Sequence, residues 1–264
     1  MSTPQPRPEA TDEVTALARG LVVLQTVASH RGPLGHTELS RLTGIPKTTM
    51  TRLLGTLVSH HMLLQEHDGE RYSLGAGALD LGSAYLRHFD VRARIRPYLV
   101  ELAEFSGATV HLGVRDRFDM VLIDTIRPDT GMIFSRLDIG ARLNVCTSAI
   151  GRAYLHELAP DERRQLLESA RIAAADEWAR WGSGVEAALQ EADRTGYCAS
   201  FGEWHPHVNS IAIGFTGPHG TRYAFNCGGP SFVFDRDTML QRIGPRLVAC
   251  RAAIVEKIGK TSLA

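Results

Sequence analysis

Apolar side chains recur every three to four residues over 14–28, a period that predicts an amphipathic helix. A short helix is expected over 38–42, with Thr37 as its N-cap. A third helix is expected over 45–57, where a proline opens the segment, leucines and a methionine share one face, and threonines with Arg52 occupy the other. The pattern therefore predicts three small helices in close succession.

Two short strand-like runs follow, at 62–65 and 71–74, and the Asp68-Gly69 pair between them is a strong hairpin signal. Three helices with an appended hairpin make the winged helix-turn-helix arrangement, in which the third helix enters the major groove of DNA and the hairpin contacts adjacent backbone. We therefore predict a winged helix-turn-helix DNA-binding domain over 14–76. Residues 1–13 are polar and proline-rich, and we expect them to form a disordered leader.

The pattern changes in the second half of the chain. A linker helix is expected over 77–90, and the hydrophobic period becomes two from Thr109 onward, which indicates strands. Strands are expected at 110–114, 120–126, 132–136, 211–215 and 223–226, and helices at 147–157, 160–170, 184–196 and 237–258. A mixed domain of sheet and helices over 91–260 follows, and the fold class of the whole chain is predicted to be α+β.

The 264 residues are 44% hydrophobic and 22% charged, and no apolar run approaches the roughly 20 residues that a membrane span needs. We therefore expect a cytoplasmic protein with no membrane partner. Basic and acidic residues balance at 29 each, although residues 14–76 hold six basic and four acidic side chains. The four cysteines lie too far apart in sequence for a CxxC motif or a zinc finger, so no metal or other cofactor is predicted.

The start of the third helix carries chemistry suited to nucleic acid. Lys47 and Arg52 bracket Thr48, Thr49 and Thr51, and ammonium, guanidinium and hydroxyl groups donate hydrogen bonds to phosphate oxygens and base edges. The alternative is a small solvated helical domain whose threonines cap and solubilise the helix. The ordered set of three helices and a hairpin favours DNA binding.

Several sequence blocks resemble a known family. In the first domain they are ALARGLVVL at 16–24, LSRLTGIPKTTMTRLL at 39–54 and RYSLG at 71–75; downstream they are IGARL at 139–143, GRA at 151–153, GYCA at 196–199 with Glu203, IA at 211–212 and GP at 229–230. In order and spacing these blocks resemble the IclR family of bacterial transcription regulators. The resemblance covers nearly the whole chain beyond the leader, and the block at 39–54 is its most specific part.

The resemblance implies a GAF-like α/β effector domain that binds a small organic acid, and homodimers that commonly pair into homotetramers. It implies DNA contacts from Pro46, Lys47, Thr48, Thr49, Thr51 and Arg52, with backbone support from Arg19 and Arg71. It implies effector contacts from Thr147, Ser148, Ala149, Ser200, Ser210, Asn226 and Gly228. Two positions depart from the family pattern: His207 stands where the family usually has glycine, and Gly228 stands where it often has serine. These departures imply an effector different from that of the best-known members.

The residues themselves are compatible with such a pocket. A helix that begins near Thr147 offers free amides and a positive dipole end to a carboxylate. Apolar walls for a ring-bearing ligand are available from Ile133, Phe134, Leu143, Val145, Phe201 and Trp204. Trp204 is the most ligand-like of these because it lies in a loop-like segment. The alternative for each residue is ordinary core or loop packing.

Two further groups of residues are candidates for metal or redox chemistry. His205 and His207 flank a proline without a nearby cysteine or aspartate, so solvated loop histidines are favoured over a metal site. The cysteines are candidates for redox chemistry only if they are exposed and have a low pKa. The chain shows no GxSxG, P-loop, HExxH or dinucleotide motif, and no clustered nucleophile and base.

We therefore expect a sequence-specific transcription regulator, repressor or activator, and not an enzyme. It would bind a double-stranded DNA operator and respond to a small carboxylate effector, with an aromatic acid as a candidate, in control of a catabolic operon. One alternative is a small-molecule-binding enzyme or sensor whose N-terminal domain only dimerises. Another is a DNA-binding protein without a ligand.

Overall fold

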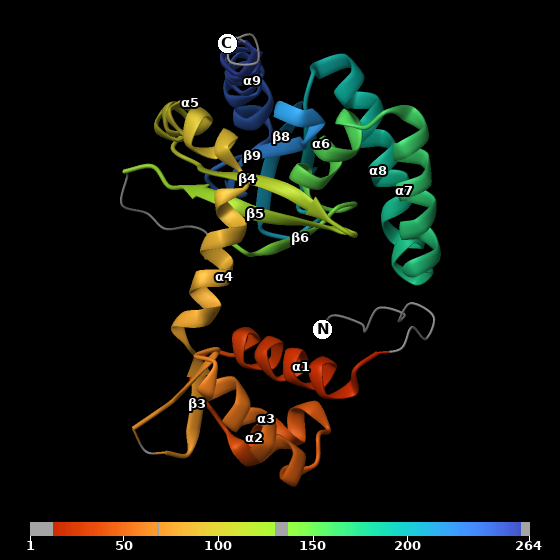
Figure 1. Ribbon diagram of the computed structural model, residues 1–264. Helices are drawn as coiled ribbons and strands as arrows, with labels where there is room; N and C mark the ends of the chain where they lie inside the picture. Colours follow the sequence, from red (N-terminus) through yellow and green to blue (C-terminus); the bar gives the residue numbers. More distant parts are fainter. Residues whose placement is uncertain (1–12, 68, 130–136, 260–264) are drawn as a thin grey trace. The chain divides into compact units, whose positions relative to one another are not determined.

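The computed structural model describes residues 13–67, 69–129 and 137–259, and the chain separates between Phe89 and Asp90 into two compact units. Figure 1 shows both units, the first built mainly of helices and the second around a sheet. Among the described helices, none is long and apolar enough to cross a bilayer.

The first unit contains the predicted winged helix-turn-helix fold. Its elements are α1 (Thr15–Ser29), β1 (Leu34–Gly35), α2 (His36–Thr43), α3 (Lys47–Ser59), β2 (Leu63–Gln65), β3 (Arg71–Leu74) and α4 (Ala76–Arg87). The apolar faces of the helices meet in one small core, formed by Val23, Val27, Leu34, Leu39, Ile45, Met50, Leu54 and Leu63. Met50 and Leu54 belong to the apolar face predicted for the third helix. On α1 the prediction was wrong, because the core contains Val23 and Val27 whereas Leu17 and Leu21, which the helical period assigned to the apolar face, are exposed.

The hairpin of the first unit is the wing, formed by β2 and β3. The two strands pair antiparallel, and β1 adds a third strand on the other side of β3, in the order β1-β3-β2. Gly69 has a φ of 72°, the left-handed conformation that suits glycine in a tight turn. Asp68, the other half of the predicted turn signal, lies outside the described residues.

Two details of the first unit differ from the prediction. The sequence pattern did not reveal β1, because two residues are too few to show alternation. The second helix begins at His36, so Gly35 and not Thr37 is its N-cap, and no side chain caps the helix. Gly35 pairs with Arg71 in the sheet, and the helix starts directly after it, two residues earlier than the capping preference indicated.

The second unit is an α/β domain around a six-stranded antiparallel sheet in the order β6-β5-β4-β9-β8-β7. Its strands are β4 (Thr109–Asp116), β5 (Asp119–Ile126), β6 (Arg142–Asn144), β7 (Cys198–Phe201), β8 (Val208–Thr216) and β9 (Arg222–Pro230). Its helices are α5 (Asp90–Ser106), α6 (Ala149–Glu157), α7 (Pro160–Ala173), α8 (Ala175–Thr195) and α9 (Gly244–Gly259), with short helical turns at Pro218–Gly220 and Thr238–Ile243.

Helices cover both faces of this sheet, with α6 on one face and α5 and α9 on the other (Figure 1). Glycines on β4 and β8 let α6 approach closely. A Cβ atom at Gly214 would lie 2.7 Å from the carbonyl oxygen of Ala153, and one at Gly113 would lie 3.1 Å from Cδ1 of Ile150. α6 therefore packs closely against β4 and β8. The part of the sheet near the N-terminal end of α6 is not covered by the helix.

The opposite face of the sheet holds the large apolar side chains and one buried charge. The rings of Phe215 and Tyr223 stack there at 5.3 Å between centroids. Asp124 is buried and accepts from Nη1 of Arg96 on α5, at 2.5 Å to Oδ1 and 2.6 Å to Oδ2. An ionised carboxylate in this position needs such a partner, since burial without one is costly.

Most predicted elements of the second unit are present with shifted ends. The predicted strand at 132–136, together with Ile133 and Phe134, lies outside the described residues. The strands β6 and β7 were not predicted. The helix expected at 184–196 begins at Ala175, and the last helix is divided into a π-helical turn at Thr238–Ile243 and α9.

Candidate functional site

The turn between α2 and α3 is fixed by local hydrogen bonds. Gly44 has a φ of 70°, and its N–H donates to the Ser40 carbonyl oxygen at 3.0 Å. The Ser40 hydroxyl donates to the carbonyl oxygen of Ile45 at 2.6 Å, and the Ile45 side chain is buried in the core. Glycine at this left-handed position ends α2 and sets the direction in which α3 begins.

The N-terminal half of α3 presents the predicted DNA-contacting residues. Pro46 is the N-cap, and Pro46, Lys47, Thr48, Thr51 and Arg52 are exposed. Thr49 is half-buried. The opposite face of α3 is anchored by core side chains, so the exposed groups project from a fixed helix, as a recognition helix requires.

One of these groups is held by a neighbouring helix. The hydroxyl of Thr51 donates to the carbonyl oxygen of Lys47 at 3.1 Å and lies 3.0 Å from Nε2 of His36. The same imidazole nitrogen lies 3.2 Å from the Lys47 carbonyl oxygen. The predicted backbone contacts Arg19, on α1, and Arg71, at the start of β3, are also exposed.

The second unit contains a cavity of about 240 Å³ at the N-terminal end of α6. It is lined by His111, Leu137, Leu143, Ser148, Ala149, Ile150, Ser200, Trp204, His205, Val208, Ser210, Asn226, Gly228 and Gly229. All of the predicted effector-contacting residues except Thr147 belong to this lining. Of the predicted apolar walls, Leu143 and Trp204 line the cavity, whereas Val145 and Phe201 do not.

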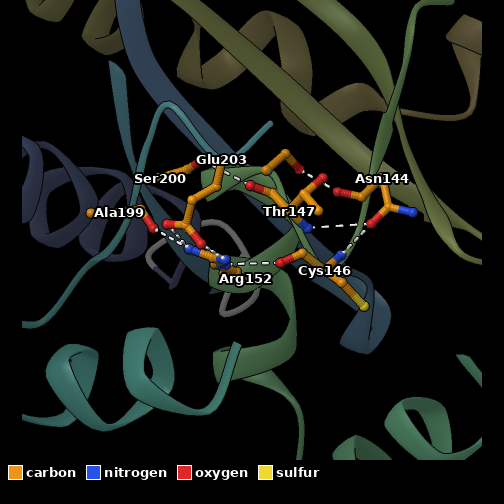
Figure 2. A network of polar contacts seen from close by, with 8 residues as sticks. Asn144, Cys146, Thr147, Arg152, Ala199, Ser200 and Glu203 are labelled. Atoms are coloured by element: carbon orange, nitrogen blue, oxygen red, sulfur yellow. Dashed lines mark hydrogen bonds and ion pairs between the residues drawn. The ribbon is translucent and has the colours of Figure 1, made fainter. Parts of the chain in front are cut away.

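The N-terminal end of α6 is shaped by the side chain of Asn144. Its Oδ1 accepts from the amides of Cys146 at 2.8 Å and Thr147 at 3.2 Å (Figure 2). Ser148 is the N-cap, and its hydroxyl oxygen accepts from the Gly151 amide at 3.2 Å. Thr147 contributes through its backbone, because its carbonyl oxygen accepts from the Ser200 hydroxyl at 2.8 Å.

Two backbone amides at this end remain available. The N–H groups of Ala149 and Ile150 have no hydrogen-bond acceptor among the described residues, and both residues line the cavity. The N-terminus of a helix carries a partial positive charge in addition to its free N–H groups. The arrangement therefore suits a carboxylate or another anion.

An ion pair between the buried Arg152 and the exposed Glu203 lies next to the cavity. The Arg152 side chain, which is 1% exposed, donates from Nε to the Cys146 carbonyl oxygen at 2.8 Å and from Nη1 to the Ala199 carbonyl oxygen at 2.9 Å. Its guanidinium also pairs with both carboxylate oxygens of Glu203, next to Trp204 (Figure 2). All three guanidinium nitrogens are thus occupied, so Arg152 positions the cavity wall and is not a free cation for a ligand.

Comparison with known proteins identifies the family. The profile of the bacterial transcriptional regulator IclR C-terminal domain matches residues 83–256, and that of the IclR helix-turn-helix domain matches residues 16–67. The chain belongs to the IclR family. It is therefore a DNA-binding transcriptional regulator, as its curated relatives are, and no enzyme family is indicated.

Relatives of this IclR-family protein cover nearly its full length. The HTH-type transcriptional regulator TsaQ1/TsaQ2 of Comamonas testosteroni is 32% identical over 89% of this chain and 84% of its own. The crystal structure of an IclR family regulator from Brucella abortus superposes with a TM-score of 0.76, at 38% identity and 93% coverage of both chains. An IclR homologue from Microbacterium hydrocarbonoxydans, solved with 4-hydroxybenzoate, shares the fold, with a TM-score of 0.71 at 20% identity, and covers 93% of this chain and 100% of its own.

The sequence reasoning missed six lining residues of this IclR-family protein: His111, Leu137, Ile150, His205, Val208 and Gly229. His111 is the most notable, because it is a polar residue only 3% exposed. Burial lowers the pKa of His111 to about 4. The hydrogen bond to Asn226 raises the pKa but does not cancel the effect of burial. The sequence signal for His111 was its place in the alternating run at 109–114. A polar side chain in such a strand must lie on one of the two faces of the sheet.

The cysteines and histidines of this regulator give no sign of redox or metal chemistry within the described residues. All four cysteines are buried, and burial raises the pKa of Cys146 to about 11 and of Cys198, Cys227 and Cys250 to about 12. Such thiols are protonated and unreactive at neutral pH. No group of three or more potential metal ligands occurs in the part of the chain that is described.

Proposed function

We propose that this IclR-family protein controls a catabolic operon in the bacterial cytoplasm and that an aromatic carboxylate, bound in the cavity beside α6, is its effector. The observation that carries the proposal is that helix-terminal amides without an acceptor among the described residues and apolar side chains line the same cavity. Amides and dipole would hold the carboxylate, and Leu143, Ile150 and Trp204 would hold the ring. The predicted contacts Ser148, Ala149, Ser200, Ser210, Asn226 and Gly228 belong to the same lining, while Thr147 would act through its backbone.

The DNA-binding part is proposed to comprise residues 14–76, joined by a linker helix at 77–90 to an effector domain at 91–260. Its recognition surface would consist of Pro46, Lys47, Thr48, Thr49, Thr51 and Arg52, with Arg19 and Arg71 on the phosphate backbone. A homodimer or homotetramer would place two such surfaces in successive major grooves of a pseudo-palindromic operator. Effector binding would shift the balance between two arrangements of the protein that differ in their affinity for DNA.

The bound 4-hydroxybenzoate of the Microbacterium homologue supports an aromatic acid as the class to test first. The cavity volume of about 240 Å³ lies below the range of about 300–1,000 Å³ typical of sites for drug-sized ligands, which favours a single-ring acid.

The DNA-binding proposal is tested by mobility shift with the full-length protein and DNA from upstream of its own gene. The expected result is a sequence-selective complex that weakens as salt rises, because phosphate contacts release counterions. Arg52→Ala should abolish selective binding without changing the oligomer size. Arg164→Ala, which removes an exposed arginine of α7, is the matched control and should bind as the wild type does. Unchanged operator affinity of the Arg52 variant would show that α3 is not the reading element.

The effector proposal is tested in the same assay by adding benzoate and its hydroxy derivatives. A change in operator affinity at a fixed protein concentration supports an aromatic acid effector. Absence of any change, together with no shift of the melting temperature, would exclude this class while leaving the DNA-binding proposal intact.

A further inference from the structure

One histidine in the cavity lining has a ring nitrogen without a hydrogen-bond partner among the described residues. His111 lies on β4, is only 3% exposed, and its Nε2 has no hydrogen-bond partner among the described residues. Buried polar groups are normally hydrogen-bonded, so an unpaired nitrogen at the edge of a cavity is open to a hydrogen bond from the water or ligand that fills the cavity.

The neighbouring strands determine what this nitrogen can do. Nδ1 of His111 lies 3.2 Å from Oδ1 of Asn226, its cross-strand partner on β9. Nδ2 of Asn226 donates to the Ser210 hydroxyl at 2.9 Å, and that hydroxyl donates to the Cys227 carbonyl oxygen at 3.2 Å. We call these groups, His111, Asn226, Ser210 and the Cys227 carbonyl, the polar chain.

The polar chain runs in one direction. A carbonyl oxygen only accepts hydrogen bonds, so the Ser210 hydroxyl donates to the Cys227 carbonyl oxygen and accepts from the amide nitrogen of Asn226. The amide oxygen of Asn226 then faces His111 and accepts a hydrogen bond from it, which places the imidazole hydrogen on Nδ1. Burial, which lowers the pKa of His111 to about 4, keeps the ring neutral at neutral pH. Nε2 therefore carries a lone pair and is a hydrogen-bond acceptor.

The cavity thus offers donors and an acceptor in one lining. The amides of Ala149 and Ile150 are donors suited to an anion, and Nε2 of His111 is an acceptor suited to a hydroxyl. Cδ1 of Ile150 lies close to Gly113, two residues along β4 from His111 and on the same face of the sheet. His111 and the strand position that packs on the Ile150 side chain are therefore about 7 Å apart along β4 at the usual rise per residue.

We propose that His111 accepts a hydrogen bond from a hydroxyl of the effector, so that the cavity selects hydroxy-substituted aromatic carboxylates over the unsubstituted acids. This inference rests on the proposed function, in which the cavity binds an aromatic acid. The acid group alone does not require His111, so the two proposals fail in different experiments.

The first test measures the affinity of the full-length protein by calorimetry for benzoate, the three hydroxybenzoates and the corresponding methoxybenzoates. At least one hydroxybenzoate should bind about tenfold or more tightly than benzoate, because otherwise the buried acceptor stays unpaired. Its methoxy counterpart, which has no proton to donate, should lose that advantage. Equal affinity for benzoate and all hydroxybenzoates would overturn the role of His111 and leave the aromatic effector standing. Binding of none of these acids would overturn both proposals.

The second test uses two variants of the same histidine. His111→Phe removes the acceptor and should bind benzoate and the preferred hydroxybenzoate with similar affinity. His111→Gln keeps an acceptor oxygen and should retain part of the selectivity. His219→Phe is the matched control, because His219 is exposed and outside the cavity lining. Full selectivity in the phenylalanine variant would show that another group reads the hydroxyl. If that variant does not fold, the glutamine variant and the ligand series on the wild type decide.

Discussion

The buried His111 makes the stability of the second unit depend on pH in a defined window. Its folded pKa is about 4, below the ordinary value of 6.5, because burial disfavours the charged ring. As pH falls below 6.5, the unfolded chain takes up a proton that the folded chain does not. The unfolded state then binds more protons, so the free energy of unfolding decreases as pH falls from 6.5 to 4 and is unaffected by this group above pH 6.5.

The size of the effect follows from the shift in pKa. Each pKa unit corresponds to about 1.36 kcal/mol, so a shift from 6.5 to about 4 amounts to about 3 kcal/mol across the full window. Between pH 7 and pH 4.5 the expected loss is about 2–3 kcal/mol. Carboxylates also titrate in this range, so the prediction concerns the difference between the wild type and His111→Gln, whose side chain does not titrate.

Urea unfolding followed by tryptophan fluorescence is a suitable assay. The three tryptophans, Trp178, Trp181 and Trp204, all belong to the second unit, so their emission reports on the unit that contains His111. The free energy of unfolding is measured at several values from pH 4.5 to 7.5 for the wild type, His111→Gln and the control His207→Gln. The wild type and the control should lose about 2–3 kcal/mol more than His111→Gln.

Two results would refute the reasoning. One is an equal loss of stability in the wild type and His111→Gln over this window. The other is a midpoint near pH 6.5 for the ring protons of His111 in an NMR titration of the folded protein, since that midpoint would mean that the ring is solvated and not buried. Either result would also remove the support that the neutral ring gives to an acceptor role for Nε2.

Two further substitutions test the packing around the cavity. In Gly151→Ala the new Cβ would lie 2.4 Å from backbone atoms, and we expect the melting temperature to fall with a loss of about 1–3 kcal/mol, whereas Gly82→Ala, with nothing within 4 Å, should be neutral or stabilising. A Gly151 variant as stable as the wild type would contradict the close contact. Glu203→Gln removes the charge that pairs with the buried Arg152, and because Glu203 is 40% exposed we expect a loss of about 1–3 kcal/mol in urea unfolding. Glu168→Gln, which removes one member of an exposed pair on α7, should leave stability unchanged, and equal effects of the two glutamine variants would contradict a stabilising role for the Arg152–Glu203 pair.

Local patterns were sufficient for much of the fold. The helix expected at 45–57 is α3, Lys47–Ser59, because a proline start and a repeating apolar face need no distant information. The strand expected at 120–126 is β5, Asp119–Ile126, because a short run of apolar residues is also a local signal. The family resemblance is confirmed by the matched profiles, and the DNA-binding function of the family follows from it.

Long-range packing accounts for what sequence patterns missed. β6 and β7 have three and four residues, too few to establish a period, and they exist because a neighbouring strand offers hydrogen bonds. The role of His111 as a lining residue depends on Asn226, which is 115 residues away in sequence. No local pattern contains that pairing, and the effector and DNA contacts themselves stay predictions.

The glycines beneath α6 influence the height of the cavity, a property that is usually assigned to the side chains that line it. Gly113 and Gly214 face the helix, not the cavity, and each missing Cβ lets the helix lie closer to the sheet. The height of the space in which an effector would bind is therefore set from beneath the helix. An alanine at Gly214 would place its Cβ 2.7 Å from the Ala153 carbonyl oxygen and is expected to push α6 away from β8, so a substitution outside the cavity lining would change the space in which an effector is proposed to bind.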